Sequence, residues 1–158
     1  MKRIYFFLEC AMVLALLMGF TSCMNSDLPD LPTYTSAEIT QFSFEYRFQV
    51  PVGDAGPKLQ VKTLDTDVTI DTESSTVYCT ITVPDVAGTF TAEERAKVSL
   101  SNIVGIANIS SGATISPIGD SPKLGVRSDF SKKEFQYQVV GGNGLTKDWK
   151  LVIRDFKK

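Results

Sequence analysis

The clearest pattern in this chain is a strict alternation of apolar and polar residues in the stretch ITQFSFEYRFQV. The apolar positions of this stretch are Phe42, Phe44, Tyr46, Phe48 and Val50. A period of two residues is expected of a β-strand with one buried face. An aromatic stripe of this kind can be a platform for stacking sugar rings, but it is more often half of a sandwich core. We therefore predict a strand over residues 39–50 with a buried aromatic face.

Shorter stretches of strand spacing follow. Pro and Gly residues in PVGDAG mark a turn, and two strands are predicted after it, at residues 58–63 and 67–71. In the later stretch TVYCTITVP the apolar positions share one face: Val77, Cys79, Ile81 and Val83. Cys79 is therefore expected to be a small core residue.

A short helix is predicted between two of the strands. Thr91 and Glu94 have the spacing of a helix-capping box, with Thr91 as the N-cap. Val98 and Leu100 already resume strand spacing, so the helix should have only about two turns. A single helix of this length fits a crossover between strands and does not indicate a repeated βα unit.

The C-terminal part predicts an antiparallel hairpin. Two alternating runs, around Tyr137 and around Trp149, are separated by the turn sequence GGNG. Trp149 should point inward with Tyr137 and Phe135. Together these elements predict one all-β domain over residues 38–158, an antiparallel β-sandwich of about seven strands.

The N-terminal segment has the pattern of an export signal. Lys2 and Arg3 precede an apolar run that ends at Phe20 and is interrupted by Glu9. The uninterrupted part is shorter than the about 20 residues that span a bilayer, and it is typical of a secretory signal peptide. We predict that residues 1–22 are a signal peptide and that residues 23–37, which are rich in proline and polar residues, are a linker.

The end of this segment, FTSC, resembles a bacterial lipobox in the relaxed form of Bacteroidetes lipoproteins. In those proteins the cysteine sulfur carries a diacylglyceryl group, and the chain is cut before that cysteine. The resemblance implies that Cys23 is the lipidation site, and attachment through two or more acyl chains is stable. The alternative is that Cys23 is an incidental residue beside an ordinary signal or an uncleaved anchor.

Composition excludes several classes of function. The formal net charge is −2 and there is no histidine. No basic field is available for nucleic acid, and the Ser-His-Asp, Cys-His and common zinc sites cannot form. Carboxylate pairs for glycoside hydrolysis are expected by chance among 18 acidic residues. We predict no catalytic residue, no cofactor and no partner nucleic acid.

One acidic stretch, DTDVTIDTE, suggests calcium. Its carboxylates belong to Asp65, Asp67, Asp71 and Glu73. An EF-hand loop needs an oxygen ligand at its fifth position and glycine at its sixth, and these positions hold Thr69 and Ile70. We therefore predict no metal site and interpret the stretch as a solvated acidic turn. The alternative is a looser calcium site in a loop between strands.

The second half of the chain resembles a known module. It contains GATISP at residues 112–117, DFS at 129–131, YQV at 137–139, and a W-x-L-x-I run from Trp149. This set is similar to the closing half of the immunoglobulin-like domains of unknown function found in Bacteroidetes surface lipoproteins, and the likeness extends over residues 37–155. The resemblance implies an immunoglobulin-like sandwich, partners among surface glycan-uptake systems, and no catalytic residue.

Two functional hypotheses follow for a protein exported by the Sec route and lipid-anchored at the outer membrane or cell surface. The first is a non-catalytic binding or adaptor module for a polysaccharide, an oligosaccharide or a protein of an uptake complex. The second is a structural spacer or subunit without a small-molecule ligand. Exposed aromatic residues distinguish them, and the candidates for a solvent-facing binding surface are Tyr34, Tyr78 and Phe90.

Overall fold

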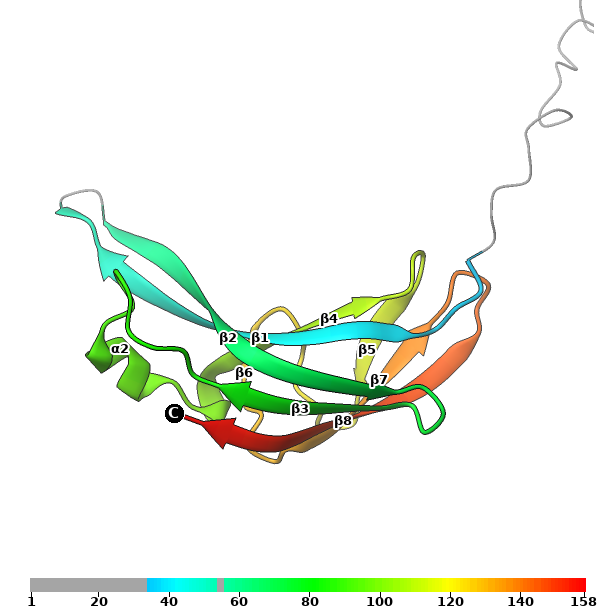
Figure 1. The fold of residues 1–158 in the computed structure, drawn as a ribbon. Coiled ribbons are helices and arrows are strands. Elements are labelled where there is room, and N and C mark those ends of the chain that lie inside the picture. The colour runs from blue at the N-terminus through cyan, green and yellow to red at the C-terminus, as the bar shows by residue number, and fades with distance from the viewer. Residues whose placement is uncertain (1–33, 54–55) are drawn as a thin grey trace, which may run out of the picture. The chain divides into compact units, whose positions relative to one another are not determined.

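The computed structural model describes residues 34–53 and 56–158 (Figure 1). The predicted signal peptide, most of the linker and Cys23 lie outside the described residues. In the part of the chain that the structure describes, no helix is both long enough and apolar enough to cross a membrane.

Strands dominate the described part, which also holds one short α-helix and one turn of 3-10 helix. In chain order the elements are β1 (Ile39–Pro51), β2 (Pro57–Asp71), β3 (Thr76–Thr82), α2 (Ala92–Lys97), η2 (Leu100–Asn102), β4 (Ile103–Ile109), β5 (Thr114–Ile118), β6 (Arg127–Ser128), β7 (Glu134–Val140) and β8 (Thr146–Lys157). The prediction of an all-β fold is confirmed.

All the strands belong to one sheet, in the order β5-β7-β8-β3-β2-β1-β4-β6. Neighbouring strands are antiparallel except β3 and β8, which run parallel. The predicted antiparallel, immunoglobulin-like sandwich is not confirmed, because a sandwich has two separate layers and here one curled sheet forms a half-barrel.

The sheet curls because its long strands change partners along their length. β2 pairs with β1 through residues 57–64 and with β3 through residues 65–71. Along β8 the change is gradual, since residues 146–152 pair with β7 and residues 150–157 pair with β3. Each change displaces the next strand along the strand axis, and together with the right-handed strand twist this bends the sheet toward its inner face. The inner face thus encloses a single core.

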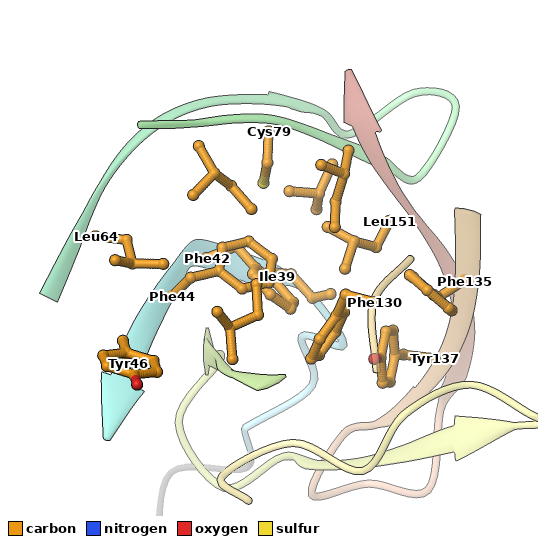
Figure 2. Packing of buried hydrophobic residues seen from close by; sticks show 14 of the residues in the cluster. Ile39, Phe42, Phe44, Tyr46, Leu64, Cys79, Phe130, Phe135, Tyr137 and Leu151 are labelled. Atoms are coloured by element: carbon orange, nitrogen blue, oxygen red, sulfur yellow. The ribbon is translucent and has the colours of Figure 1, made fainter. Parts of the chain in front are cut away.

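Aromatic side chains fill that core (Figure 2). The stripe predicted for β1 is buried at Phe42, Phe44, Tyr46 and Phe48. Phe130, just after β6, stands edge-on to both Phe44 and Phe135, with ring centroids 5.3 and 5.4 Å apart. Such edge-to-face pairs each add about 0.5–1.5 kcal/mol beyond the burial of their area.

The predicted C-terminal hairpin is confirmed as the antiparallel pair β7 and β8. Trp149 points inward, as predicted, and its indole Nε1 donates a hydrogen bond of 3.0 Å to the carbonyl oxygen of Ala37. Tyr137 is also buried, and its hydroxyl donates to the carbonyl oxygen of Pro122 at 2.9 Å. Both polar atoms therefore have partners inside the core, as buried polar groups require.

Two predicted boundaries are wrong. The strands expected at residues 58–63 and 67–71 are one strand, β2, in which exposed and less exposed side chains alternate through the buried Leu64. Strand spacing does not resume at Val98 and Leu100 either. The side chain of Asn102 accepts from the backbone of Ser99 and donates to the carbonyl oxygen of Lys97, which stabilises the 3-10 turn η2 before β4 begins.

The predicted N-cap is confirmed, since Thr91 Oγ1 accepts from the Glu94 backbone.

Candidate functional site

Phe90 does not face the solvent, so that prediction is wrong. Its side chain is only 2 % exposed. A bridge between Ala87 and Phe90 turns the chain back on itself, and the ring packs against Tyr46 and Phe48 at centroid distances of 6.3 and 5.9 Å. Lys62 lies over the same ring, with its Nζ 5.5 Å from the centroid. Phe90 is therefore a core residue.

Tyr78 lies on the outer face of β3 and is half-buried. The guanidinium of Arg154 lies over its ring, 4.0 Å from the centroid. This cation–π contact occupies one face of the ring, so a sugar could stack only on the other face.

Tyr34 is exposed, at 52 %. It borders a hollow of about 290 Å³ that is otherwise lined by the hydroxyl-bearing residues Thr35, Ser36, Ser110 and Ser111. Its ring lies against Gly112, where a Cβ atom would come within 3.2 Å of it. The three candidate aromatics thus occupy three separate environments, and the structure brings no two of them into one stacking platform.

Cys79 lies in the core, which confirms the prediction from its strand face. Burial, with a smaller contribution from the charge of Asp67, raises the pKa of the Cys79 thiol to about 12. A thiolate is the reactive form of cysteine, so the native protein keeps this sulfur protonated and unreactive at neutral pH.

The acidic stretch runs along the end of β2 and into the turn that follows it. Asp71 Oδ1 accepts from the backbones of Glu73 and Ser74, and Oδ2 accepts from the Ser74 hydroxyl at 2.7 Å. The Ser74 side-chain and backbone hydrogen bonds hold the pKa of Asp71 below its usual range. Asp65 and Asp67 point outward from β2, opposite Thr82 and Thr80. Within residues 34–53 and 56–158 no three acidic or cysteine side chains gather as metal ligands would.

The most unusual surface of the described part lies on the projecting end of the β1–β2 hairpin. We call residues 44–51 and 57–64 the ribbon; along them β1 and β2 pair with each other (Figure 1). Its inner face is covered by Phe90 and by α2, where Glu94 accepts a hydrogen bond of 3.1 Å from the Tyr46 hydroxyl.

The outer face of β2 carries exposed aliphatic side chains within the ribbon and polar side chains further along the strand. Leu59 is 57 % exposed and Val61 is 51 % exposed, and they lie opposite Gln49 and Arg47. Val126, 47 % exposed, directly follows Gly125, whose carbonyl oxygen accepts a hydrogen bond from Arg47 Nη1. Further along β2 the same face carries Thr63, Asp65, Asp67 and Thr69.

Two arginines complete this surface. Arg47 is paired with Glu45 at 3.1 Å. Arg127 donates from its guanidinium to the carbonyl oxygen of Arg47, and no carboxylate of the described residues forms an ion pair with it. We define the ribbon patch as Leu59, Val61, Val126, Arg47 and Arg127. The sequence does carry a sign of this patch: Leu59 and Val61 are apolar residues at alternate positions that otherwise hold polar residues in β2.

Fold and surface together define a small all-β domain with an exposed apolar and basic patch. The chain belongs to the DUF5018-related family, whose model matches residues 39–152. A crystal structure of a Bacteroides fragilis protein, provisionally described as secreted, is similar at 36% identity and a TM-score of 0.73. The match covers 80% of this chain and 100% of that one. This neighbour is consistent with export. No curated protein matches the chain.

Proposed function

We propose that this protein is an exported lipoprotein, anchored through Cys23, whose β domain binds a partner protein at the outer membrane or cell surface. The lipobox-like FTSC sequence and the similarity to a protein described as secreted support export and anchoring. The domain acts as a non-catalytic adaptor, as a chain without histidine and without a cluster of acids in its described part suggests. A glycan-uptake assembly is the setting that its family resemblance favours.

The observation that carries the adaptor role is the ribbon patch. Two half-exposed aliphatic side chains, Leu59 and Val61, are neighbours on the outer face of β2, and a third, Val126, follows Gly125, which Arg47 of the ribbon contacts. Contiguous exposed apolar surface on a soluble domain commonly marks an interaction site. Along residues 46–51 of β1 and 57–64 of β2, the outer edges of the ribbon pair with no other strand of the described part, and such edges can accept a strand from another chain.

The chemistry of the ribbon patch defines the partner surface. Its aliphatic side chains require an apolar counterpart, while Arg127 requires a carboxylate. Arginine is enriched among the residues that dominate binding energy at protein interfaces. The partner is therefore a protein with an apolar patch next to an acidic residue.

Sedimentation of the detergent-extracted full-length protein tests this role. We expect the wild type to sediment in a complex heavier than the monomer, and the double variant Leu59→Ser/Val61→Ser to sediment as the monomer. The control is Thr63→Ser/Thr69→Ser, which alters the outer face of the same strand outside the patch and should retain the complex. Thermal unfolding shows whether each variant is folded. A monomeric wild type would favour the spacer role, and a patch variant that stays in the complex would reject the ribbon as the interface.

A further inference from the structure

A second hollow lies on the outer face of the sheet, where the turn after β5 folds over β7 and β8. Its volume is about 410 Å³, within the range of about 300–1,000 Å³ that small-molecule sites occupy. Six polar residues line it: Asp120, Ser121, Lys132, Glu134, Gln136 and Lys150. None of them belongs to the ribbon patch.

The wall of this hollow is fixed before any ligand arrives. The Ser121 backbone N–H donates to the carbonyl oxygen of Ile118, which closes the turn, and Ser121 Oγ accepts from the Gln136 backbone at 2.9 Å. The next residue, Pro122, is buried and is held by the Tyr137 hydroxyl. A preformed site avoids the entropic cost of ordering a loop on binding.

Every charge in the hollow is already neutralised. Lys132 pairs with Asp120, and Lys150 pairs with Glu134 at 2.8 Å. The Lys132 hydrogen bond holds the pKa of Asp120 below its usual range and raises that of Lys132, so this pair stays ionised at neutral pH. An anionic, cationic or zwitterionic ligand would have to compete with these pairs, whereas a neutral hydroxyl would not. An ammonium has three protons and a carboxylate has about four acceptor sites, so each paired group keeps capacity for hydroxyl groups.

Gln136 stands in the middle of this row of groups. Its cross-strand neighbours are Ile118 on β5 and Lys150 on β8. Its side-chain amide makes no hydrogen bond to the residues that the structure describes, so it can both donate to and accept from a ligand. Ile118, half-buried at the edge, offers a small apolar contact. We propose that this hollow binds a neutral saccharide through hydrogen bonds to its hydroxyl groups. This site depends neither on lipidation nor on the ribbon patch.

Binding is tested with the mature chain from residue 23, carrying Cys23→Ala so that no lipid is attached. The ¹⁵N-labelled protein is titrated separately with maltotriose, mannotriose and xylotriose, and with trigalacturonate and glycylglycine as charged probes. We expect at least one neutral trisaccharide to shift the amide resonances of Ser121, Gln136 and Lys150 in a saturable manner that added salt does not weaken. The charged probes should not do so.

Two glutamines on the outer face of β7 supply matched variants. Gln136→Ala should raise the dissociation constant about three- to tenfold, as expected for the loss of one or two hydrogen bonds. Gln138→Ala, outside the hollow, should leave it unchanged. The proposal is overturned if no neutral trisaccharide shifts these amides, if only a charged probe binds, if the shifts map to the hollow beside Tyr34, or if Gln136→Ala binds as tightly as the wild type.

Discussion

Among the glycines of the described residues, Gly105 has the least room for a side chain. A Cβ atom there would meet Phe130 Cζ at 2.7 Å and Leu124 Cδ2 at 3.2 Å. Real Cβ atoms do not approach that closely, and the Phe130 ring is itself fixed between Phe44 and Phe135. In a core packed this closely, one added methyl group lowers the stability of the fold.

Gly105→Ala should therefore destabilise the domain by about 1–3 kcal/mol, the usual cost of overpacking a core. Urea unfolding measures this free energy. The additional change Phe130→Leu should recover part of the loss, because it shortens the side chain that the new methyl group meets. The exposed Asn108→Ala on the same strand is the control, and a Gly105→Ala protein as stable as that control would refute this account of the packing.

Cys79 gives a second prediction at this scale. Its raised pKa keeps the thiol protonated at pH 8, so the mature Cys23→Ala protein should react with iodoacetamide only as fast as it unfolds. Addition of urea should unfold the domain and make the alkylation of Cys79 fast. Stoichiometric labelling of the native protein within minutes would show that the thiol is accessible and contradict its place in the core.

The burial of single residues could be predicted from the sequence where they lie in a strand with alternating apolar and polar residues. Alternation correctly assigns the β1 aromatics, Cys79 and Trp149 to the interior. It fails at Phe90, because this residue lies in the irregular segment after β3, where no neighbouring period indicates which side faces the core. The tight turn between Ala87 and Phe90 decides its orientation.

At the scale of elements, α2 is held against the inner face of the ribbon by a small polar cluster. Glu94 accepts from Lys97 Nζ at 2.6 Å and from the Tyr46 hydroxyl. These contacts, led by the Lys97 hydrogen bond, hold the pKa of Glu94 below its usual range. Arg95 also ties α2 to the carbonyl oxygens of Val83 and Pro84.

The lowered pKa predicts how stability depends on pH. A carboxylate whose folded pKa lies below its unfolded value stabilises the fold above the unfolded pKa, about 4.3 for Glu, and this contribution is lost as the pH falls through the folded pKa. Glu94→Gln cannot titrate. Urea unfolding between pH 7 and pH 3 should therefore show a larger loss for the wild type than for Glu94→Gln, and equal losses would contradict the role of Glu94.

A secondary-structure element could be predicted from the sequence when the alternation of apolar and polar residues agreed with the turn residues beside it. The β7–β8 hairpin has alternation on both sides of a glycine-rich turn, and it is found where expected. β4 does not alternate between apolar and polar residues, because its outer face is apolar as well as its inner face. The outer face carries Val104 and Ile106, which pair with Glu45 and Ser43 of β1. β2 is one strand because nothing breaks the chain between Thr63 and Asp67.

For the whole molecule, the decisive feature is the order of strands in a single curled sheet. A period of two shows which side of a strand is buried, but it does not show which strand lies beside it. The parallel pairing of β3 with β8 joins residues that are distant in sequence, and no local pattern predicts it. The partner changes along β2 and β8 likewise depend on the assembled sheet, which explains why a sandwich was the expectation and a half-barrel the result.

The candidate surfaces show the same limit. The ribbon patch joins residues from β1, β2, β6 and the position just before β6, and the polar hollow joins residues from three other segments. Each depends on contacts between distant parts of the chain, so sequence patterns alone could not assemble either. Tyr34 and Tyr78 could be named as candidates from the sequence, but their separation became clear only in the fold.

The proposed anchor makes a prediction for the intact protein. Cys23→Ala should move the protein from the membrane fraction to the soluble fraction of the periplasm, because no acyl chains would remain to hold it. Mass spectrometry of the wild type should place the mature N-terminus at a diacylglyceryl-modified Cys23. Retention of the variant in the membrane, or an unmodified cysteine at this position, would reject lipid anchoring.

The adaptor role rests on the ribbon patch, and site-specific photo-crosslinking tests it most directly. A benzophenone amino acid is placed in the full-length protein at Val61 or, as the control, at Thr69, which is also exposed on the outer face of β2. On irradiation of intact cells, the account predicts a discrete protein adduct from position 61 and none from position 69. No adduct from position 61, or the same adduct from both positions, would contradict it.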